Sequence, residues 1–186
     1  MNFTRNVLEN AVLNALNNAE ELFEEAVILE DNKKYARAYT LFHLSIEEVG
    51  KVFVIFKYLL GNDYSVEIMK KFSNEFRLHK VKIDSATNID VIATWLIDGG
   101  ELTAEIINNV TYSKAEIENL NELKNLSLYS FFHKNSSFKP SDIIKQNDVR
   151  KIHLTAQYRI KGTSDLSKSF LPNLDSLIKV IEDNKY

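Results

Sequence analysis

Hydrophobic residues recur every three or four positions along most of this chain, which is the spacing that places them on one face of an α-helix. Two long runs of this kind come first, at residues 4–30 and 33–60. The second run also has apolar residues outside its main stripe, namely Leu44, Ile46, Val54, Ile55 and Tyr58. Helices that are apolar on several sides lie at the centre of a bundle or face a second subunit. We therefore expect residues 33–60 to take one of these two positions.

The helical pattern continues beyond these two runs. It predicts further helices at about residues 65–82, 101–126, 141–161 and 164–183. The last of these is expected to bend at Pro172, because proline disrupts a helix interior. Residues 83–99 are ambiguous, although a short helix closed by the two glycines that follow it would fit there. The aromatic stretch at 127–142 contains Ser136, Ser137 and Pro140, which favour a loop. Its apolar side chains are expected to pack back on the bundle.

These elements predict an all-α protein, an up-and-down helical bundle with additional C-terminal helices. We expect a single helical domain over residues 1–186, with the bundle core at about 4–128, an aromatic loop at 129–140 and C-terminal helices at 141–184. Only five glycines and two prolines occur in 186 residues, which argues against an all-β fold with many turns.

Composition and charge exclude several classes of function. The chain has no cysteine, so disulfides, cysteine-bound zinc and thiol catalysis are ruled out. The N-terminal residues do not resemble a signal peptide, and the apolar residues at 52–60 are too few to span a bilayer. A cytoplasmic protein without a membrane partner is expected. The net charge of −3 predicts no nucleic-acid partner, but residues 133–168 carry eight Lys or Arg against three Asp. That basic region is either an RNA-contacting face or an ordinary surface, which is solvated or packs against acidic residues of the same chain.

The second helix carries charged residues in an otherwise apolar run. His43, Glu47 and Lys51 are spaced four residues apart and share one side of the helix, with Glu48 at the border of the core. Gly50 points toward the same side, and a glycine inside a helix is unfavourable by about 1 kcal/mol. We therefore expect a neighbouring backbone to come close to Gly50 and cover this row. The alternative is an ordinary surface ion pair between Glu47 and Lys51.

A second charged group lies in the third predicted helix. Glu75, His79 and Lys82 share one face, and His79 has cationic neighbours. A neutral imidazole beside fixed positive charge is suited to phosphodiester chemistry, since the imidazole moves the proton and the cations stabilise charge on phosphorus. The alternative is a solvated basic helix end. The sequence contains neither a known metal-binding motif nor a glycine-rich phosphate-binding loop, so no metal and no cofactor is predicted.

These two charged groups also carry a family resemblance. The chain resembles the AbiV family of abortive-infection proteins, in the HEPN superfamily of helical-bundle proteins that act on RNA, at residues 47–51 (Glu-Glu-Val-Gly-Lys) and then at Phe76, His79 and Lys82. The resemblance implies a bacterial defence protein that stops phage multiplication by arresting growth or translation of the infected cell. It also implies a homodimer with a HEPN-like bundle. Many HEPN proteins are metal-independent ribonucleases with an Arg and, a few residues later, a His, and Arg37 and His43 have this spacing.

Two hypotheses of different classes follow. In the first, the protein is a metal-independent ribonuclease with catalytic residues Glu47, Glu48, Lys51, His79 and Lys82, which a dimer brings together. In the second, it is a non-catalytic helical dimer whose charged row fixes the register of the bundle and which acts by binding a phage protein or the translation machinery. The partners expected are a second copy, RNA or the ribosome, and a phage-encoded activator protein. The alternative site, Arg37 with His43, stays open.

Overall fold

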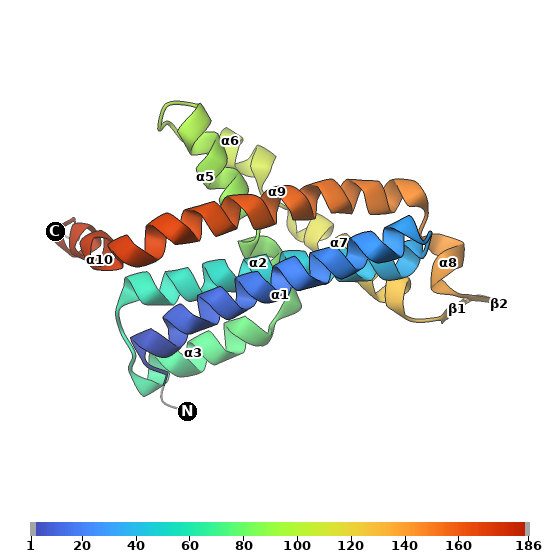
Figure 1. Cartoon of the computed structure of the whole chain (residues 1–186), viewed down its shortest axis with the longest axis horizontal. Coiled ribbons are helices and arrows are strands. Elements are labelled where there is room, and N and C mark those ends of the chain that lie inside the picture. The colour runs from blue at the N-terminus through green and yellow to red at the C-terminus, as the bar shows by residue number, and fades with distance from the viewer. Residues whose placement is uncertain (1–2, 185–186) are drawn as a thin grey trace.

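Two long helices joined by a three-residue turn begin the fold. The computed structural model describes residues 3–184; residues 1–2 and 185–186, which the predicted domain includes, lie outside this part. α1 (Arg5–Asp31) begins after Thr4, whose side chain accepts a hydrogen bond from the backbone of Val7. α2 (Tyr35–Gly61) follows, and the two helices pack along their lengths (Figure 1). The predicted boundaries of both helices are confirmed to within two residues.

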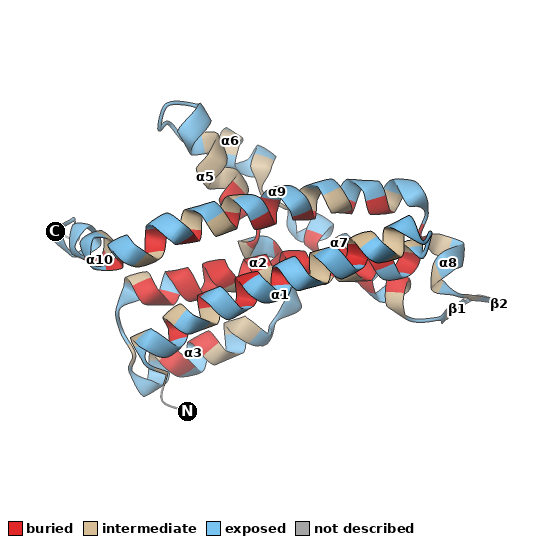
Figure 2. Ribbon diagram, viewed as in Figure 1, coloured by how far each residue is buried: buried red, intermediate tan, exposed pale blue. Residues whose placement is uncertain are grey.

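α2 is the central helix of the bundle. It packs against α1, α3, α4, α7, α8, α9 and α10, and most of its residues are buried (Figure 2). Val54, Ile55 and Tyr58, which lie off its main apolar stripe, are buried as well. The prediction of a central position is therefore confirmed, because the surrounding helices cover α2 on several sides.

The predicted helix at 65–82 is wrong, since two helices occupy this stretch. α3 (Val66–Arg77) ends at Leu78, which has an extended backbone, and α4 (His79–Ser85) begins immediately after it. The break has a tertiary cause, because α4 lies with its backbone directly against Gly50 of α2. A Cβ atom on Gly50 would lie 1.9 Å from the carbonyl oxygen of Lys82. The expected close approach of a backbone at Gly50 is thus confirmed.

The next two helices form an arm on one side of the bundle. α5 (Asn88–Ile97) fills the ambiguous stretch and is followed by Gly99 and Gly100, both with positive φ. The predicted helix at 101–126 is wrong, because α6 (Ala104–Val110) and α7 (Lys114–Leu128) are separate. A capping box formed by Ser113 and Glu116 starts α7. The arm of α5 and α6 projects beyond α9 (Figure 1).

The aromatic stretch forms a small hairpin instead of packing on the bundle. β1 (Phe131–His133) pairs antiparallel with β2 (Ser136–Phe138) at one end of the molecule (Figure 1). The rings of Phe131 and Phe138 stack on each other with centroids 5.4 Å apart. Phe132 points to the other face of the hairpin and is 85% exposed. The prediction that this stretch packs back on the bundle is therefore wrong for Phe132 and for Tyr129, which is 62% exposed.

The C-terminal region is one long helix with a short helix on either side. α8 (Pro140–Ile143) precedes α9 (Gln146–Phe170), which runs through the predicted break near residue 162. Gly162 faces the side chain of Ile89 in α5, so this glycine makes room for α5 and does not end the helix. The bend at Pro172 is confirmed by the 3-10 turn η1 (Leu171–Asn173) before α10 (Leu174–Asp183). Within residues 3–184, no helix has the length and apolar character needed to cross a membrane.

Candidate functional site

Glu47 is a buried carboxylate at the point where three helices meet. Its side chain is 2% exposed, and its Oε2 atom lies 2.6 Å from His79 Nδ1 and 3.1 Å from Lys82 Nζ. Its other oxygen, Oε1, accepts a hydrogen bond of 3.0 Å from Lys124 Nζ. We call Glu47, His79, Lys82 and Lys124 the Glu47 cluster. Its members come from α2, α4 and α7.

The path of the chain explains why these side chains meet. His79 and Lys82 are one helical turn apart on α4, so both face Glu47. The absence of a side chain at Gly50 lets the backbone of α4 come close enough for these contacts. The structure therefore brings together three of the five predicted site residues, and their catalytic role stays a prediction.

Lys124 is the member of the cluster that sequence reasoning missed. It lies seven residues after the buried Ile117, so it shares the inward face of α7. A lysine at an inward position of an amphipathic helix is rarely buried without a charged partner. That spacing was the signal in the sequence that pointed to a buried carboxylate opposite it.

The cluster combines a stabilised carboxylate with an excess of positive charge. Burial alone would raise the pKa of Glu47, but the hydrogen bond from His79 and the charges of Lys82 and Lys124 outweigh it, so the pKa lies below its usual value. With Glu47 ionised, the two lysines leave the cluster with a net charge of about +1 before His79 is counted. This charge lies next to the one member of the cluster that solvent reaches freely.

His79 is that member, with a side chain that is 54% exposed. When the ring is neutral, a carboxylate that accepts from Nδ1–H leaves the lone pair on Nε2. Lys82 and Lys124 are only 8% exposed, so they act on a bound molecule through their charge and not by direct contact. The arrangement presents an oriented proton acceptor to solvent in a positive field, which suits general-base attack on an anionic substrate.

Glu48 and Lys51 form a separate pair. The Lys51 ammonium group bonds to Glu48 Oε1 and lies 5.4 Å from the centre of the Phe76 ring on α3. Lys51 therefore pairs with Glu48 and not with Glu47. No hydrogen bond or ion pair within residues 3–184 joins this pair to the Glu47 cluster. The expected meeting of all five residues does not occur in one protomer, because Glu47 bonds to residues of α4 and α7 whereas Glu48 bonds to Lys51 of its own helix.

Two other expected groupings are also separated. Glu75 pairs with Lys57 at 2.9 Å and not with His79, since the break at Leu78 turns α4 away from the line of α3. Arg37 is exposed and donates a hydrogen bond of 2.9 Å to the backbone of Leu128. His43 lies in the interior, where burial lowers its pKa to about 4, with its Nε2 atom 3.6 Å from Glu47 Oε1. Arg37 and His43 therefore do not share a solvent-facing site.

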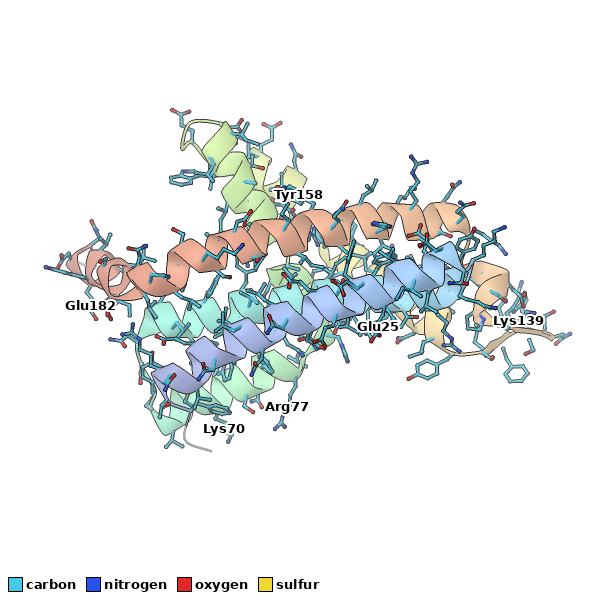
Figure 3. The ribbon with its side chains drawn as sticks, viewed as in Figure 1. Glu25, Lys70, Arg77, Lys139, Tyr158 and Glu182 are labelled. Carbon is cyan, nitrogen blue, oxygen red and sulfur yellow. The ribbon has the colours of Figure 1, made fainter. Side chains whose placement is uncertain are left out.

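A cleft lined by basic residues lies at the N-terminal end of α2. We call it the basic cleft. It has a volume of about 710 Å³, and its charged lining residues are all cationic, namely Lys33, Lys34, Arg37, Lys139 and Lys145. Lys139 lies beside the hairpin at this end of the molecule (Figure 3). These cationic residues come from two separate parts of the sequence, 33–37 and 139–145, so the fold concentrates positive charge that the basic C-terminal region predicted only in part.

No group of three His, Cys, Asp or Glu side chains suited to holding a metal ion occurs in residues 3–184.

Comparison with known proteins supports the family assignment. Searches of curated proteins and of solved structures found no match to the chain. The model of the AbiV family of HEPN domains matches residues 7–161, which is well over half of the sequence. The chain therefore belongs to the AbiV family of HEPN domains, a family of abortive-infection proteins that act in phage defence.

Proposed function

We propose that this phage-defence protein is a ribonuclease and that Glu47 and His79 are its general-base pair. The observation that supports this most directly is the hydrogen bond of 2.6 Å between a buried carboxylate and a half-exposed imidazole. A histidine that only fills the core is covered from solvent, and an ordinary surface histidine has no buried carboxylate as its partner. An oriented imidazole open to solvent is the arrangement that proton transfer to a bound substrate requires.

The proposed reaction uses the ribose next to the cleaved bond. His79 Nε2 takes the proton of the 2′-hydroxyl, and the resulting oxygen attacks the adjacent phosphorus. The bond from phosphorus to the 5′ oxygen breaks, that oxygen takes a proton from water, and a 2′,3′-cyclic phosphate remains. Lys82 and Lys124 stabilise the negative charge that develops on the phosphorane through their field. Direct contact with phosphate is assigned to the exposed cations on either side of His79, Arg77 and Lys80.

The basic cleft supplies a second reason to expect RNA. Five cations and no carboxylate line it, which suits the phosphate backbone of a single strand. Arg37 in the cleft and Glu47 in the cluster are ten residues apart on α2, a distance of about 15 Å along the helix axis. A short stretch of RNA spans that distance, so one strand held in the cleft would reach His79.

Expression in bacteria tests this proposal. We expect the wild-type protein to arrest growth and to produce new discrete RNA fragments on a gel of total RNA. His79→Ala should abolish both effects, while His133→Ala, which removes an exposed histidine of the hairpin, should abolish neither. Circular dichroism and a melting curve confirm that each variant is folded. Fragments that persist with folded His79→Ala would rule out His79 as the base.

A non-catalytic binding protein is the second candidate, and one observation favours it. Glu47, Lys82 and Lys124 are all buried, and an ion group buried between helices fixes the register of the bundle in some proteins. In that case growth arrest would come from binding the translation machinery or a phage protein, with intact RNA. The same gel separates the two, because arrest without RNA fragments is expected only of the binding protein.

We also propose that the protein acts as a homodimer, as the family resemblance implies. Light scattering with size exclusion measures the mass in solution. A mass close to 43 kDa, twice the 21.4 kDa of one chain, is expected. A mass that stays near that of one chain at all protein concentrations would contradict the dimer and would leave the assignment of His79 unaffected.

A further inference from the structure

The hairpin at one end of the molecule carries an aromatic ring that solvent surrounds. Phe132 is 85% exposed, which makes it the most exposed aromatic residue within residues 3–184. Its neighbours Phe131 and Phe138 cover each other by stacking, with ring centroids 5.4 Å apart. Single exposed apolar side chains are common on protein surfaces, so exposure alone assigns no role to Phe132. Its position beside the basic cleft does.

The pairing of the two strands places Phe132 on a particular face of the hairpin. Phe132 is opposite Ser137, and Phe131 is opposite Phe138. Because successive side chains of a strand point to opposite faces, Phe132 and Ser137 lie on the face away from the two stacked rings. Lys139 still has an extended backbone, with φ −100° and ψ 157°. The alternation therefore continues, and Lys139 lies on the same face as Ser137 and Phe132.

This face of the hairpin continues into the basic cleft. Extending the register by one pair beyond Phe131 and Phe138 brings Ser130 opposite Lys139, and both of these residues line the cleft. Phe132 is two residues from Ser130, a distance of about 7 Å along the strand. The exposed ring therefore lies beside a cleft whose charged lining residues are all cationic.

A cationic cleft next to an exposed aromatic ring is the combination that binds single-stranded nucleic acid. The cations hold the phosphates, and a base of any kind stacks on the ring because every base has a π face. The bases of a duplex are paired and stacked on one another, so a ring on the protein surface is reached only by an unpaired base. The Phe132 side chain has no hydrogen-bonding group, so it does not distinguish bases by their edges.

We propose that Phe132 is a binding site for one unpaired base of an RNA strand whose backbone lies in the basic cleft. The ring stacks on the base and the cleft holds the adjoining phosphates, so the protein selects single-stranded over duplex RNA without reading its sequence. This proposal rests on the RNA binding that belongs to the proposed function. It does not depend on cleavage by His79.

Binding of an RNA that cannot be cleaved tests the site without any contribution from His79. The probes are a short labelled adenylate strand with 2′-O-methyl riboses and the same strand paired with its complement. Fluorescence anisotropy should show tighter binding of the single strand than of the duplex. Phe132→Ala and Phe132→Leu should each bind the single strand at least about fivefold more weakly than the wild type, which corresponds to the loss of one stacked base. Phe132→Trp, which keeps an aromatic ring, should retain the affinity.

A matched control removes an exposed ring elsewhere. Tyr158 of α9 is 50% exposed and lies away from Lys139 and the hairpin (Figure 3). Tyr158→Ala should therefore bind the single strand as the wild type does. Circular dichroism and a melting curve establish that each variant is folded.

The salt dependence separates stacking from charge. Phe132→Ala should leave the slope of log affinity against log salt unchanged, because the ring releases no counterions from the RNA. Lys33→Gln with Lys34→Gln removes two cations of the cleft and should reduce that slope. A reduced slope in Phe132→Ala would show that the substitution disturbs the cleft, and would overturn the assignment of its effect to stacking.

The fluorescence of Phe132→Trp reports stacking directly. The wild type has a single tryptophan, Trp95 of α5, so its emission is the baseline. The single strand should quench the emission of Phe132→Trp more than that of the wild type, and the duplex should not. Binding of the single strand to Phe132→Trp without this additional quenching would contradict contact between the ring and a base.

The outcomes distinguish this site from the function on which it rests. Unchanged affinity of folded Phe132→Ala and Phe132→Leu, or equal affinity of the wild type for strand and duplex, would overturn the stacking site and leave the basic cleft and the role of His79 standing. Binding of neither RNA by the wild type would overturn the stacking site and the basic cleft together.

Discussion

Glu47 is the residue on which the account of this protein depends, because it joins three helices and orients His79. Its burial would favour the neutral acid, yet two lysines and a histidine keep it ionised. Gly50, three residues further along α2, makes these contacts possible by admitting the backbone of α4. Each of these residues gives a measurable prediction.

Replacing Glu47 by Gln should destabilise the protein in a pH-dependent way. The folded pKa of Glu47 lies below its ordinary value, so its stabilising effect is present above that ordinary value and is lost as pH falls through the folded pKa. Removing one partner of a buried ion pair lowers the free energy of unfolding by about 3–5 kcal/mol. Chemical unfolding at several pH values should show this difference at pH 7 and a smaller one in acid, where Glu47 becomes protonated. A difference that does not change with pH would contradict the assigned ionisation.

Gly50→Ala should destabilise the protein although alanine favours helices. The new Cβ atom would lie 1.9 Å from the carbonyl oxygen of Lys82, so α4 has to move away, and overpacking of this kind lowers the free energy of unfolding by about 1–3 kcal/mol. Gly61→Ala, at the other end of α2, is the matched control because nothing lies within 4 Å of its new Cβ atom. Urea unfolding of both variants measures the effect. Equal stability of the two would contradict the close packing of α4 on α2.

The elements of the fold show which features the sequence reveals and which it conceals. The central position of α2 followed from its apolar residues on several sides. The break at Leu78 did not, because the helical spacing continues through it and only the docking of α4 against Gly50 requires it. The predicted break between 161 and 164 was wrong for a similar reason, since the contact of Gly162 with Ile89 joins residues that are distant in sequence. For the Glu47 cluster, His79 and Lys82 were predictable from their spacing, whereas their contact with Lys124 depends on how α7 packs.

The start of α7 could have been predicted, and it gives a test at the level of the element. Ser113 and Glu116 cap α7 through reciprocal hydrogen bonds of 3.3 Å and 2.8 Å. Ser113→Ala removes one of them and is expected to lower the free energy of unfolding by about 1 kcal/mol. Lys114→Ala, at the exposed neighbouring residue, is the control and should change it by less than about 0.5 kcal/mol. Thermal unfolding measures both. An unchanged free energy of unfolding in Ser113→Ala would show that the cap does not stabilise α7, the helix that carries Lys124.

At the scale of the whole molecule, two features share the central helix. The basic cleft lies at the N-terminal end of α2, and the Glu47 cluster lies in its middle. Residues just before and just after the hairpin line the cleft together with α8, and the hairpin lies at this end of the molecule (Figure 1). The bundle therefore places a positively charged cleft and the Glu47 cluster along one helix.

RNA binding should depend on the basic cleft. Lys33→Gln, Lys34→Gln and Lys139→Gln together remove three of its cations. Because each phosphate contact releases counterions, the triple variant should bind a short single-stranded RNA more weakly, and its affinity should fall less steeply with salt. Lys161→Gln with Lys168→Gln, on the exposed side of α9, serves as the control. Fluorescence anisotropy over a salt series gives both quantities. The same affinity and slope in the triple variant as in the wild type would mean that RNA does not use this cleft.

The most direct test of the central claim is cleavage of a short labelled RNA by the purified protein without added metal. The Glu47–His79 pair predicts that the wild type leaves a 2′,3′-cyclic phosphate and that replacing the ribose at the cleaved position by 2′-deoxyribose prevents cleavage. Folded His79→Ala should lose activity by at least about a hundredfold. Cleavage of the 2′-deoxy substrate, or full activity in His79→Ala, would contradict the account.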